Sequence, residues 1–301
     1  MIAETMGMMS MLVFEVSLGV SPLIYKFIDT SISESTIVAI RYGFSSVFLF
    51  LWLLLRGGFK KQTIFSSPKR IAGILFLGII GSGVAAWWYA IAIRHVGVIL
   101  STLITNLEIP LGVFLGHRML KEHISKTYLY IFAVILIGYI LLTVKNGIEL
   151  ASGGSYVLGV GLSLGSAVIW SMCTIVGKKL MDHVSSAELS FWRLFFAVLT
   201  VSCIAWGQGE LGLDALRNIT MRDWLMLSWL GVVTSGMGLL MYYFALKVLS
   251  VKKISLFFPL SAVITVILGF AFGETPLLSQ WIGIVLITGG MVYFFLNKNV
   301  R

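Results

Sequence analysis

Charged residues and cysteines are scarce in this chain, and each shortage excludes a class of protein. Charged residues make up 12% of the 301 residues, about half of the roughly 25% found in soluble domains, which excludes an ordinary soluble domain. Cys173 and Cys203 lie in apolar segments without a metal-binding spacing, so they predict neither a metal site nor a disulfide framework. The N-terminal stretch MIAETMGMMS has no basic residue, so we expect the first apolar segment to be retained and not cleaved as a signal peptide.

Apolar segments dominate what is present. Apolar residues account for 58% of the chain, and the mean hydropathy is +0.97. Charged clusters and turn residues separate segments of about 20 apolar residues, the length that crosses a bilayer as a helix. The pattern predicts an all-α membrane protein with ten transmembrane helices. The expected spans are 6–25, 35–55, 71–93, 97–116, 127–144, 155–177, 187–206, 223–246, 254–272 and 277–296.

The formal net charge of +9 is explained by loop composition. Lysines and arginines lie mostly in short loops, which membrane topology explains better than nucleic-acid binding. With the N-terminus placed in the cytoplasm, fifteen of the 22 lysines and arginines fall in cytoplasmic loops and five in the opposite loops. This asymmetry predicts that both termini are cytoplasmic. We therefore expect a multi-pass protein of a prokaryotic inner membrane, with the lipid bilayer and not nucleic acid as its partner.

The sequence resembles itself when it is shifted by 152 or 153 residues. LGIIGSGVAAWWYAIAI (77–93) matches LGVVTSGMGLLMYYFAL (230–246), and Arg41 takes the same place in its span as Arg193. The match predicts two units, one in each half of the chain, 1–150 and 151–301.

Each unit contains five expected spans, which fixes how the two units are oriented. Because five is odd, the second unit enters the membrane from the opposite side, an inverted-topology repeat typical of secondary transporters. Two such halves can exchange conformations and open a midplane site to either side in turn, which is alternating access. The alternative is that the repeat reflects only a duplication in the ancestry of the protein, as in some channels and membrane enzymes.

Glycine and proline mark candidate packing and bending points within the spans. Gly161 and Gly165 form a GxxxG pattern, which favours close helix packing in lipid. Pro22, Pro110 and Pro259 fall inside the first, fourth and ninth spans, where proline removes a backbone donor and tends to kink the helix. Such kinks predict gates or cavity walls, and static bends are the alternative.

Two acidic residues lie deep in the expected spans. Glu15 is about nine residues into the first span and Glu108 about eleven into the fourth, which places both near the midplane at about 1.5 Å per residue. A carboxylate there is costly and is by default a functional hypothesis. It could bind a substrate ammonium group or carry a coupled proton, and a neutral acid that is hydrogen-bonded within the bundle is the alternative.

Polar and aromatic residues near these acids are further candidates. Asn106, one turn from Glu108, could line the same cavity. Aromatic side chains could receive an apolar part of the substrate, although packing and the interfacial belt explain such residues equally well. The aromatic candidates are Trp87, Trp88, Tyr89, Trp170, Tyr242 and Tyr243.

The two arginines could contact substrate directly or serve as paired elements of anchoring and gating. Each lies about six residues from the start of its span, at about 9 Å of depth. From there the head group can extend to its own interface, Arg41 toward Glu34 and Arg193 toward Glu188. We expect the anchoring and gating role for Arg41 and Arg193.

Lysines and histidines carry weaker signals. Lys252 and Lys253 could grip a phosphate group as point charges, although ordinary positive-inside charge explains them. The four histidines lie at span ends or in loops, so we expect no metal site and no cofactor. No nucleophile with an intramembrane base is available, so we expect no enzyme.

The sequence resembles the drug/metabolite transporter superfamily, in its EamA family of ten-helix carriers. The resemblance covers nearly the whole chain and rests on "AIRYGF" around Arg41, "FWRLFF" around Arg193, "WSMCTIVGKK" (170–179) and the stretch from 242 to Glu274. The first repeat departs from the pattern at two places: Leu18 stands where the second repeat has Trp170, and "NLEIPLGVFLGHRMLKE" (106–122) shifts the proline.

The resemblance implies a cavity between helices one to four and six to nine, with helices five and ten peripheral. It also implies export of metabolites, amino acids being a common class. We expect a carrier that exports amino acids or related amines by alternating access, with a small-molecule substrate and coupling protons as partners. The alternatives are an exchanger of phosphorylated or nucleotide-linked sugars and, ranked lower, a membrane enzyme or a scaffold that does not transport.

Overall fold

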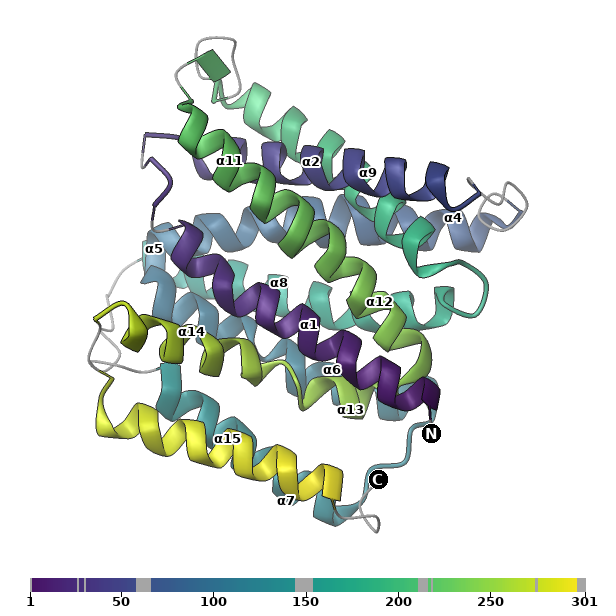
Figure 1. Ribbon diagram of the computed structural model, residues 1–301, viewed down its shortest axis with the longest axis vertical. Coiled ribbons are helices and arrows are strands. Elements are labelled where there is room, and N and C mark those ends of the chain that lie inside the picture. The colour runs from purple at the N-terminus through teal and green to yellow at the C-terminus, as the bar shows by residue number, and fades with distance from the viewer. Residues whose placement is uncertain are drawn as a thin grey trace.

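The computed structural model describes residues 2–25, 27–29, 31–57, 66–143, 154–210, 216–217, 219–273 and 276–296, and every regular element within them is a helix. Eight stretches are long and apolar enough to cross a membrane, and a ninth helix, Lys126–Leu142, is apolar but shorter. The helices lie alongside one another as a bundle (Figure 1). Glu274, part of the family pattern, lies outside the described residues.

The helices follow one another in a similar order in the two halves of the chain. The first half contains α1 (Ile2–Tyr25), α2 (Glu34–Leu55), α4 (Pro68–Leu75), η1 (Phe76–Val84), α5 (Ala85–Thr105), α6 (Glu108–Leu120) and α7 (Lys126–Thr143). The second half contains α8 (Gly154–Leu180), α9 (Ser186–Gly207), α11 (Met221–Trp229), η2 (Leu230–Met237), α12 (Gly238–Val248), α13 (Val251–Ser255), α14 (Pro259–Ala271) and α15 (Leu278–Leu296). η1 and η2 are wider, π-helical turns, and they occupy matching places in the two halves.

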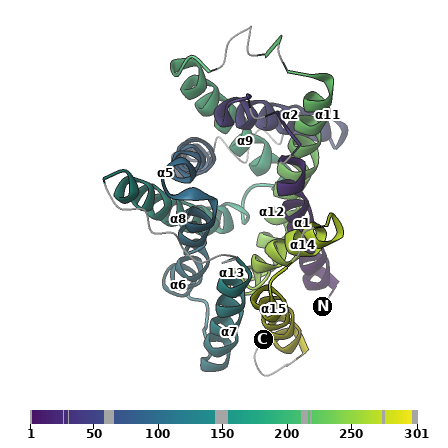
Figure 2. The ribbon, with the colours of Figure 1, turned by 90° about the vertical axis from the view of Figure 1, so that its left-hand side faces the viewer.

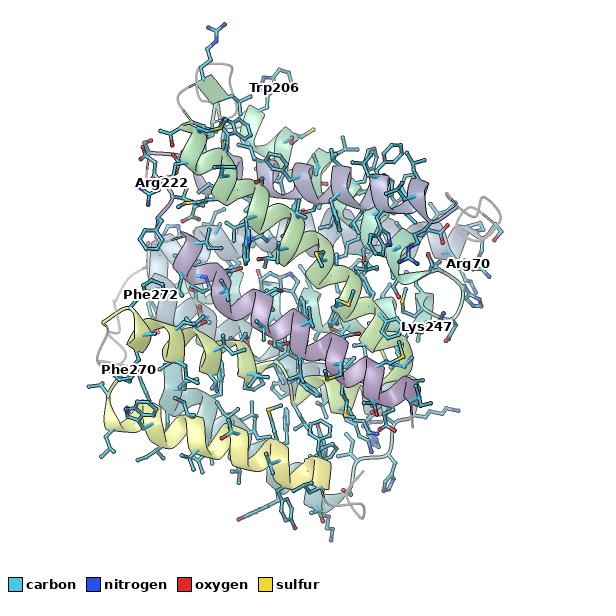
Figure 3. The ribbon with its side chains drawn as sticks, viewed as in Figure 1. Arg70, Trp206, Arg222, Lys247, Phe270 and Phe272 are labelled. Carbon is cyan, nitrogen blue, oxygen red and sulfur yellow. The ribbon has the colours of Figure 1, made fainter. Side chains whose placement is uncertain are left out.

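Basic residues lie at both ends of the bundle. α1 begins and α15 ends at the same end (Figure 1). Arg70 and Lys247 lie at that end, whereas Arg222 lies at the other (Figure 3). Positive-inside counting expects Arg70 and Lys247 on one side of the membrane and Arg222 on the opposite side, and this topology stays a prediction.

α5 is helical throughout but cannot be one straight helix. The hydroxyl oxygens of Tyr89 and Thr102 are 2.8 Å apart. Thirteen residues of straight helix would separate these positions by about 20 Å, farther than the two side chains can reach. The chain therefore reverses direction between them, close to the boundary expected from the spans 71–93 and 97–116.

Two breaks in the helices lie at matching places. α5 and α6 are interrupted at Asn106–Leu107, and α13 and α14 are interrupted at 256–258. Pro110 follows the first break and Pro259 begins α14, which agrees with the loss of a backbone donor at proline. Pro22 differs, because α1 continues past it to Tyr25.

The two halves pack on each other in equivalent pairs. α2 packs on α9 and α7 on α15, while α1 lies against α12 and α14 as α8 lies against α5 and α6. The α7–α15 pair forms one edge of the molecule, far from α2 and α9, in both views (Figures 1 and 2). Each wider turn contacts the other half, η1 on α9 and η2 on α2.

Glycines at matching positions allow these close approaches. A Cβ atom on Gly78 would lie 2.9 Å from the Arg193 carbonyl oxygen, and one on Gly231 would lie 2.6 Å from the Arg41 carbonyl oxygen. Small residues let helix backbones approach in this way. The expected GxxxG contact is half correct: a Cβ on Gly165 would meet the Trp88 ring at 2.9 Å, whereas Gly161 faces open space.

Candidate functional site

A cavity of about 210 Å³ lies where the two halves meet. The first half contributes side chains from α1, α2, η1, α5 and α6, and the second from α8, α9, α12 and the turn before α14. The lining residues are Phe14, Tyr42, Gly81, Ser82, Ala86, Glu108, Trp170, Cys173, Thr174, Arg193, Leu239, Tyr242 and Phe258. The wall is therefore largely apolar and aromatic, with one carboxylate and one guanidinium.

Arg193 on α9 lies in the cavity wall and is held by both halves. Its Nε donates to the Ser82 hydroxyl at 2.7 Å and its Nη1 donates to the Tyr243 hydroxyl at 2.8 Å. Two of the five guanidinium N–H groups are thereby engaged, which fixes the plane of the group. The remaining N–H groups can meet a ligand at the cavity.

This placement corrects the expectation that Arg193 extends to its own interface beside Glu188. Glu188 instead completes a capping box at the start of α9, where its backbone N–H and carboxylate both bond to Ser185. Such boxes satisfy helix N-termini. The sequence match between Arg193 and Arg41 could not predict this placement, because the partners of Arg193 come from other helices.

Arg41 lies differently from its counterpart. Its guanidinium carbon is 5.0 Å from the centroid of the Tyr42 ring, within the range of a cation–π contact. Tyr42 lines the cavity, but Arg41 does not. The two arginines are therefore equivalent in backbone position and different in surroundings.

Glu108 lies in the cavity wall in the first turn of α6. A helix N-terminus favours negative charge because its backbone N–H groups point toward it. Glu108 and Arg193 face the same cavity and are close enough to interact electrostatically. The site thus presents charges of both signs to one ligand.

Glu15 is the second predicted acid, and it lies outside the cavity wall. Its side chain has no exposed surface, and neither carboxyl oxygen has a hydrogen-bond partner among the described residues. Ser261 on α14 is nearby, but its hydroxyl donates to the Phe258 carbonyl oxygen at 2.9 Å. Glu15 and Glu108 are close enough for their charges to interact.

The predicted aromatic residues separate into two groups. Trp170 and Tyr242 line the cavity; the Trp170 indole donates to the Gly81 carbonyl oxygen at 2.9 Å, and the Tyr242 hydroxyl lies 3.0 Å from that of Thr174. Tyr243 does not line the cavity, but its hydroxyl accepts a hydrogen bond from the Arg193 guanidinium.

The WWY stretch of α5 lies outside the cavity. Trp87 lines a separate small cavity of about 30 Å³, and the Trp88 ring covers Gly165. Tyr89 packs against Trp170 at 5.6 Å between ring centroids. These three side chains thus form packing and secondary contacts around the site.

The side chain of Asn106 forms its hydrogen bonds outside the cavity. Its Nδ2 donates to the Tyr139 hydroxyl of α7 at 2.5 Å and to the Thr102 carbonyl oxygen at 2.7 Å. It is absent from the cavity wall, contrary to the expectation that it shares a cavity with Glu108. The break after Asn106 explains the difference, because it changes the direction of the chain between the two residues.

Lys252 and Lys253 also lie apart from the cavity. Lys253 forms an ion pair with Glu4 of α1, and the Lys252 Nζ donates to the His123 carbonyl oxygen at 3.0 Å. The Glu122 carboxylate accepts the backbone N–H groups of Val251 and Lys252 at 2.8 and 3.1 Å, which caps α13. These contacts tie loops together at one end of the bundle.

Several cavity residues were missed from the sequence. Phe14, Tyr42, Ser82, Cys173 and Phe258 carry no distinctive motif of their own. A signal existed for Cys173, because it lies three residues after Trp170 and so shares its helix face. Phe258 and Ser82 could not have been found this way, since the first lies at a helix break and the second in a wider turn.

Within the described residues, no group of three His, Cys, Asp or Glu side chains could hold a metal ion. The polar groups that face the cavity are instead suited to an organic ligand. A carboxylate can bind an ammonium group, and a guanidinium can bind a carboxylate through two parallel hydrogen bonds.

Comparison with known proteins identifies relatives of the chain. The EamA-like transporter family matches residues 5–144 and 157–296, once in each half. The "Uncharacterized transporter YyaM" of Bacillus subtilis is 25% identical over 284 residues, covering 93% of this chain and 90% of that protein. The "Riboflavin transporter ImpX" of Fusobacterium nucleatum is 25% identical over 182 residues, covering 58% and 59%. A crystal structure superposes with a TM-score of 0.80 at 18% identity, covering 99% of this chain and 98% of that chain.

Proposed function

The chain belongs to the EamA-like transporter family, and we propose that it is a secondary-active exporter of amino acids or related amines. The observation that carries the proposal is the cavity between the halves, where Glu108 and Arg193 face one space. Membership of the family makes the protein a multi-pass membrane transporter. The substrate, the direction and the mechanism are the proposed parts.

We propose that the chain crosses an inner membrane ten times in two inverted repeats, 1–150 and 151–301, with both termini in the cytoplasm. The reversal within α5 supports five crossings in the first half, because it divides Pro68–Leu120 into two antiparallel segments. The equivalent pairing of helices across the two halves supports the repeat. The common end of α1 and α15 supports the shared side of the termini (Figure 1).

Recognition of an amino acid follows from the charges in the wall. Arg193 would hold the substrate carboxylate and Glu108 the substrate ammonium group. Trp170, Tyr242 and Phe258 would then contact the substrate side chain. The cavity of about 210 Å³ is smaller than the roughly 300–1,000 Å³ of sites for drug-sized ligands, which suits a small metabolite.

Alternating access would use the breaks and wider turns. The breaks before α6 and α14 let each helix pair bend near the midplane, and Pro110 and Pro259 would act as gating elements. η1 and η2 place backbone close to the opposite half, so a tilt of one half would be transmitted to the other. Pro22, near the end of α1, would contribute less.

A riboflavin-like substrate is the second candidate, because aromatic side chains line the cavity and one relative is named a riboflavin transporter. The small cavity and the two opposite charges favour an amino acid. An exchanger of phosphorylated sugars ranks below both, since Lys252 and Lys253 bond elsewhere.

The test is transport by purified protein in proteoliposomes. A panel of amino acids, amines, riboflavin and sugar phosphates is measured with and without a pH gradient. We expect uptake of one or more amino acids or amines, and the strongest competition from molecules with both an ammonium and a carboxylate group. Exchange of phosphate esters without any amino acid transport would overturn the proposal.

A further inference from the structure

The segment that joins α12 to α13, residues 246–252, covers one end of the bundle, and we call it the strap. It lies at the end where α1 begins, because Lys253, the next residue, pairs with Glu4 there. The side chains of Leu249 and Val251 have at most 1% of their surface exposed. Apolar side chains that are fully covered at the end of a bundle must be enclosed by several helices at once.

Contacts between α8 and α12 continue from the cavity to the strap. In the cavity wall, the hydroxyl oxygens of Thr174 and Tyr242 are 3.0 Å apart. One turn farther along α12, the Leu246 side chain lies 3.3 Å from where a Cβ atom on Gly177 would be. One turn beyond Thr174, on the same face of α8, Lys178 reaches the strap. These contacts close the route between α8 and α12 from the cavity to this end.

Lys178 holds the first part of the strap. Its Nζ donates to the carbonyl oxygens of Leu246 and Leu249 at 2.5 and 2.6 Å. These carbonyl groups lie at the end of α12, where no further helical turn supplies their donors and where a helix favours a positive charge. One ammonium group therefore fixes the backbone where the chain leaves α12.

Glu122 holds the second part of the strap from the other half of the chain. Its carboxylate accepts the backbone N–H groups of Val251 and Lys252 at 2.8 and 3.1 Å. Gly116 lets α6 approach closely, because a Cβ atom there would lie 3.3 Å from the Val251 side chain. The strap is therefore tied to the first half by Glu122 and to the second half by Lys178.

One polar group of the strap is left unsatisfied between these two contacts. The Ser250 hydroxyl oxygen is buried without a hydrogen-bond partner among the described residues. Burial of an unpaired hydroxyl group is unfavourable, and water would supply the missing partner if the strap moved outward. Water can also replace the bonds that Lys178 and Glu122 make to backbone groups. The strap thus closes this end through polar contacts that can be exchanged for water.

We propose that the strap is the gate at this end of the transporter and that Lys178 and Glu122 are its latches. The inference rests on the proposed alternating access, and the proposed topology makes this the cytoplasmic gate. The break at 256–258 and Pro259 follow α13 directly and provide the hinge. When α12 and α13 swing outward on this hinge, the latches bond to water. The cavity then opens to the side from which an exporter takes its substrate.

The test uses Cys173, in the cavity wall, as a native probe. Cys203, the other cysteine of the chain, is replaced by Cys203→Ser. A small, charged methanethiosulfonate that does not cross membranes is applied to inside-out vesicles or to intact cells, so that it reaches one face at a time. The rate at which Cys173 is labelled reports whether the cavity is open to that face, and no substrate is needed.

Lys178→Met removes the ammonium group and keeps a long apolar side chain. Because a hydrogen bond to a charged group is lost only in the closed state, we expect labelling from the cytoplasmic face to rise roughly 10- to 100-fold. Labelling from the opposite face should not rise. Glu122→Gln should have a smaller effect in the same direction, because its amide oxygen still accepts a hydrogen bond.

Two further variants are the controls. Lys179→Met makes the same change of charge at the neighbouring, exposed lysine and should leave both labelling rates unchanged. Lys178→Arg still donates to the carbonyl oxygens of the strap and should label at a rate close to that of wild type.

Two outcomes contradict the inference. Equal labelling of Lys178→Met and Lys179→Met would mean that Lys178 does not hold the gate closed. A rise from both faces would mean that Lys178 only stabilises the bundle. A rise confined to the opposite face would support the gate and overturn the proposed topology. Failure of the wild type to transport any amino acid or amine in proteoliposomes overturns the proposed substrate and leaves the labelling result intact.

Discussion

The two halves share a framework and differ at the cavity. In both, a glycine of the wider turn packs on the carbonyl oxygen of an arginine from the other half, Gly78 on Arg193 and Gly231 on Arg41. Only Arg193 lines the cavity. The difference lies in its partners: Ser82 has a serine counterpart in Ser235, but Tyr243 corresponds to Ala90, so a second arginine bond of this kind cannot form.

The asymmetry teaches how a duplicated scaffold binds an asymmetric molecule. The first half contributes both intramembrane acids, and the second contributes the guanidinium and the aromatic residues Trp170 and Tyr242. The backbone packing is equivalent in the two halves, as the proposed alternating access requires. The side chains at the cavity differ between the halves, as the proposed substrate with two different ends requires.

The largest effect is expected for Arg193→Gln compared with Arg41→Gln. A hydrogen bond to a charged group contributes about 1.5–3 kcal/mol, so loss of the guanidinium should weaken substrate binding roughly 10- to 100-fold. Arg41→Gln should change binding little. The measurement is substrate affinity by calorimetry in detergent. Equal losses in the two variants would show that the arginines are functionally equivalent.

Glu108→Gln should weaken binding of amino acids by about 10-fold or more, because the ammonium group loses its charged partner. Analogues that lack the amino group should bind the variant and the wild type alike. Competition assays with matched pairs of amino acids and deaminated acids measure this. If the loss of affinity is the same for both members of a pair, Glu108 does not bind the ammonium group of the substrate.

Gly78→Ala and Gly231→Ala test the shared framework. Each new Cβ would lie closer than 3.0 Å to a backbone oxygen of the other half, and overpacking of this kind costs about 1–3 kcal/mol. We expect similar drops in the thermal unfolding temperature of the two variants. Gly161→Ala, which meets open space, is the control and should be neutral. A large drop in only one of the pair would break the equivalence.

Tyr243→Phe should have a moderate effect. It removes one hydrogen bond to the charged Arg193 guanidinium, a kind of bond worth about 1.5–3 kcal/mol. Because only the resulting misplacement of the guanidinium affects the substrate, we expect affinity to fall less than in Arg193→Gln, roughly 2- to 10-fold. Tyr128→Phe also removes one hydroxyl, which bonds to the Lys252 carbonyl oxygen, and should leave affinity unchanged. A response as small as that of Tyr128→Phe would mean that Tyr243 does not position Arg193.

Lys253→Ala should have the smallest effect. The ion pair with Glu4 is partly exposed, and such pairs contribute about 0–1 kcal/mol. We expect amino acid counterflow close to that of wild type. A complete loss of transport, rescued by no other substrate, would give this lysine a role in gating or in binding an anion.

Much of the fold could be predicted from the sequence. The helical composition, the two matching halves and the interruptions near Pro110 and Pro259 follow from apolar length, self-similarity and proline chemistry. The reversal within α5 agrees with an expected boundary although no glycine or proline cluster marks it. The role of Gly161 could not be predicted, because a GxxxG pattern does not say which side of a helix meets a neighbour.

The sequence by itself determined which residues are exceptional: two acids and two arginines in apolar spans, where each is too costly to be accidental. Tertiary structure decided how they differ. Whether Glu15 or Glu108 faces the cavity depends on helix rotation and on the break before α6, and whether Arg193 or Arg41 does so depends on Ser82 and Tyr243 from other helices. The physical reason is that depth in the membrane follows from position along the chain, whereas the partners of a side chain are supplied by segments far apart in sequence.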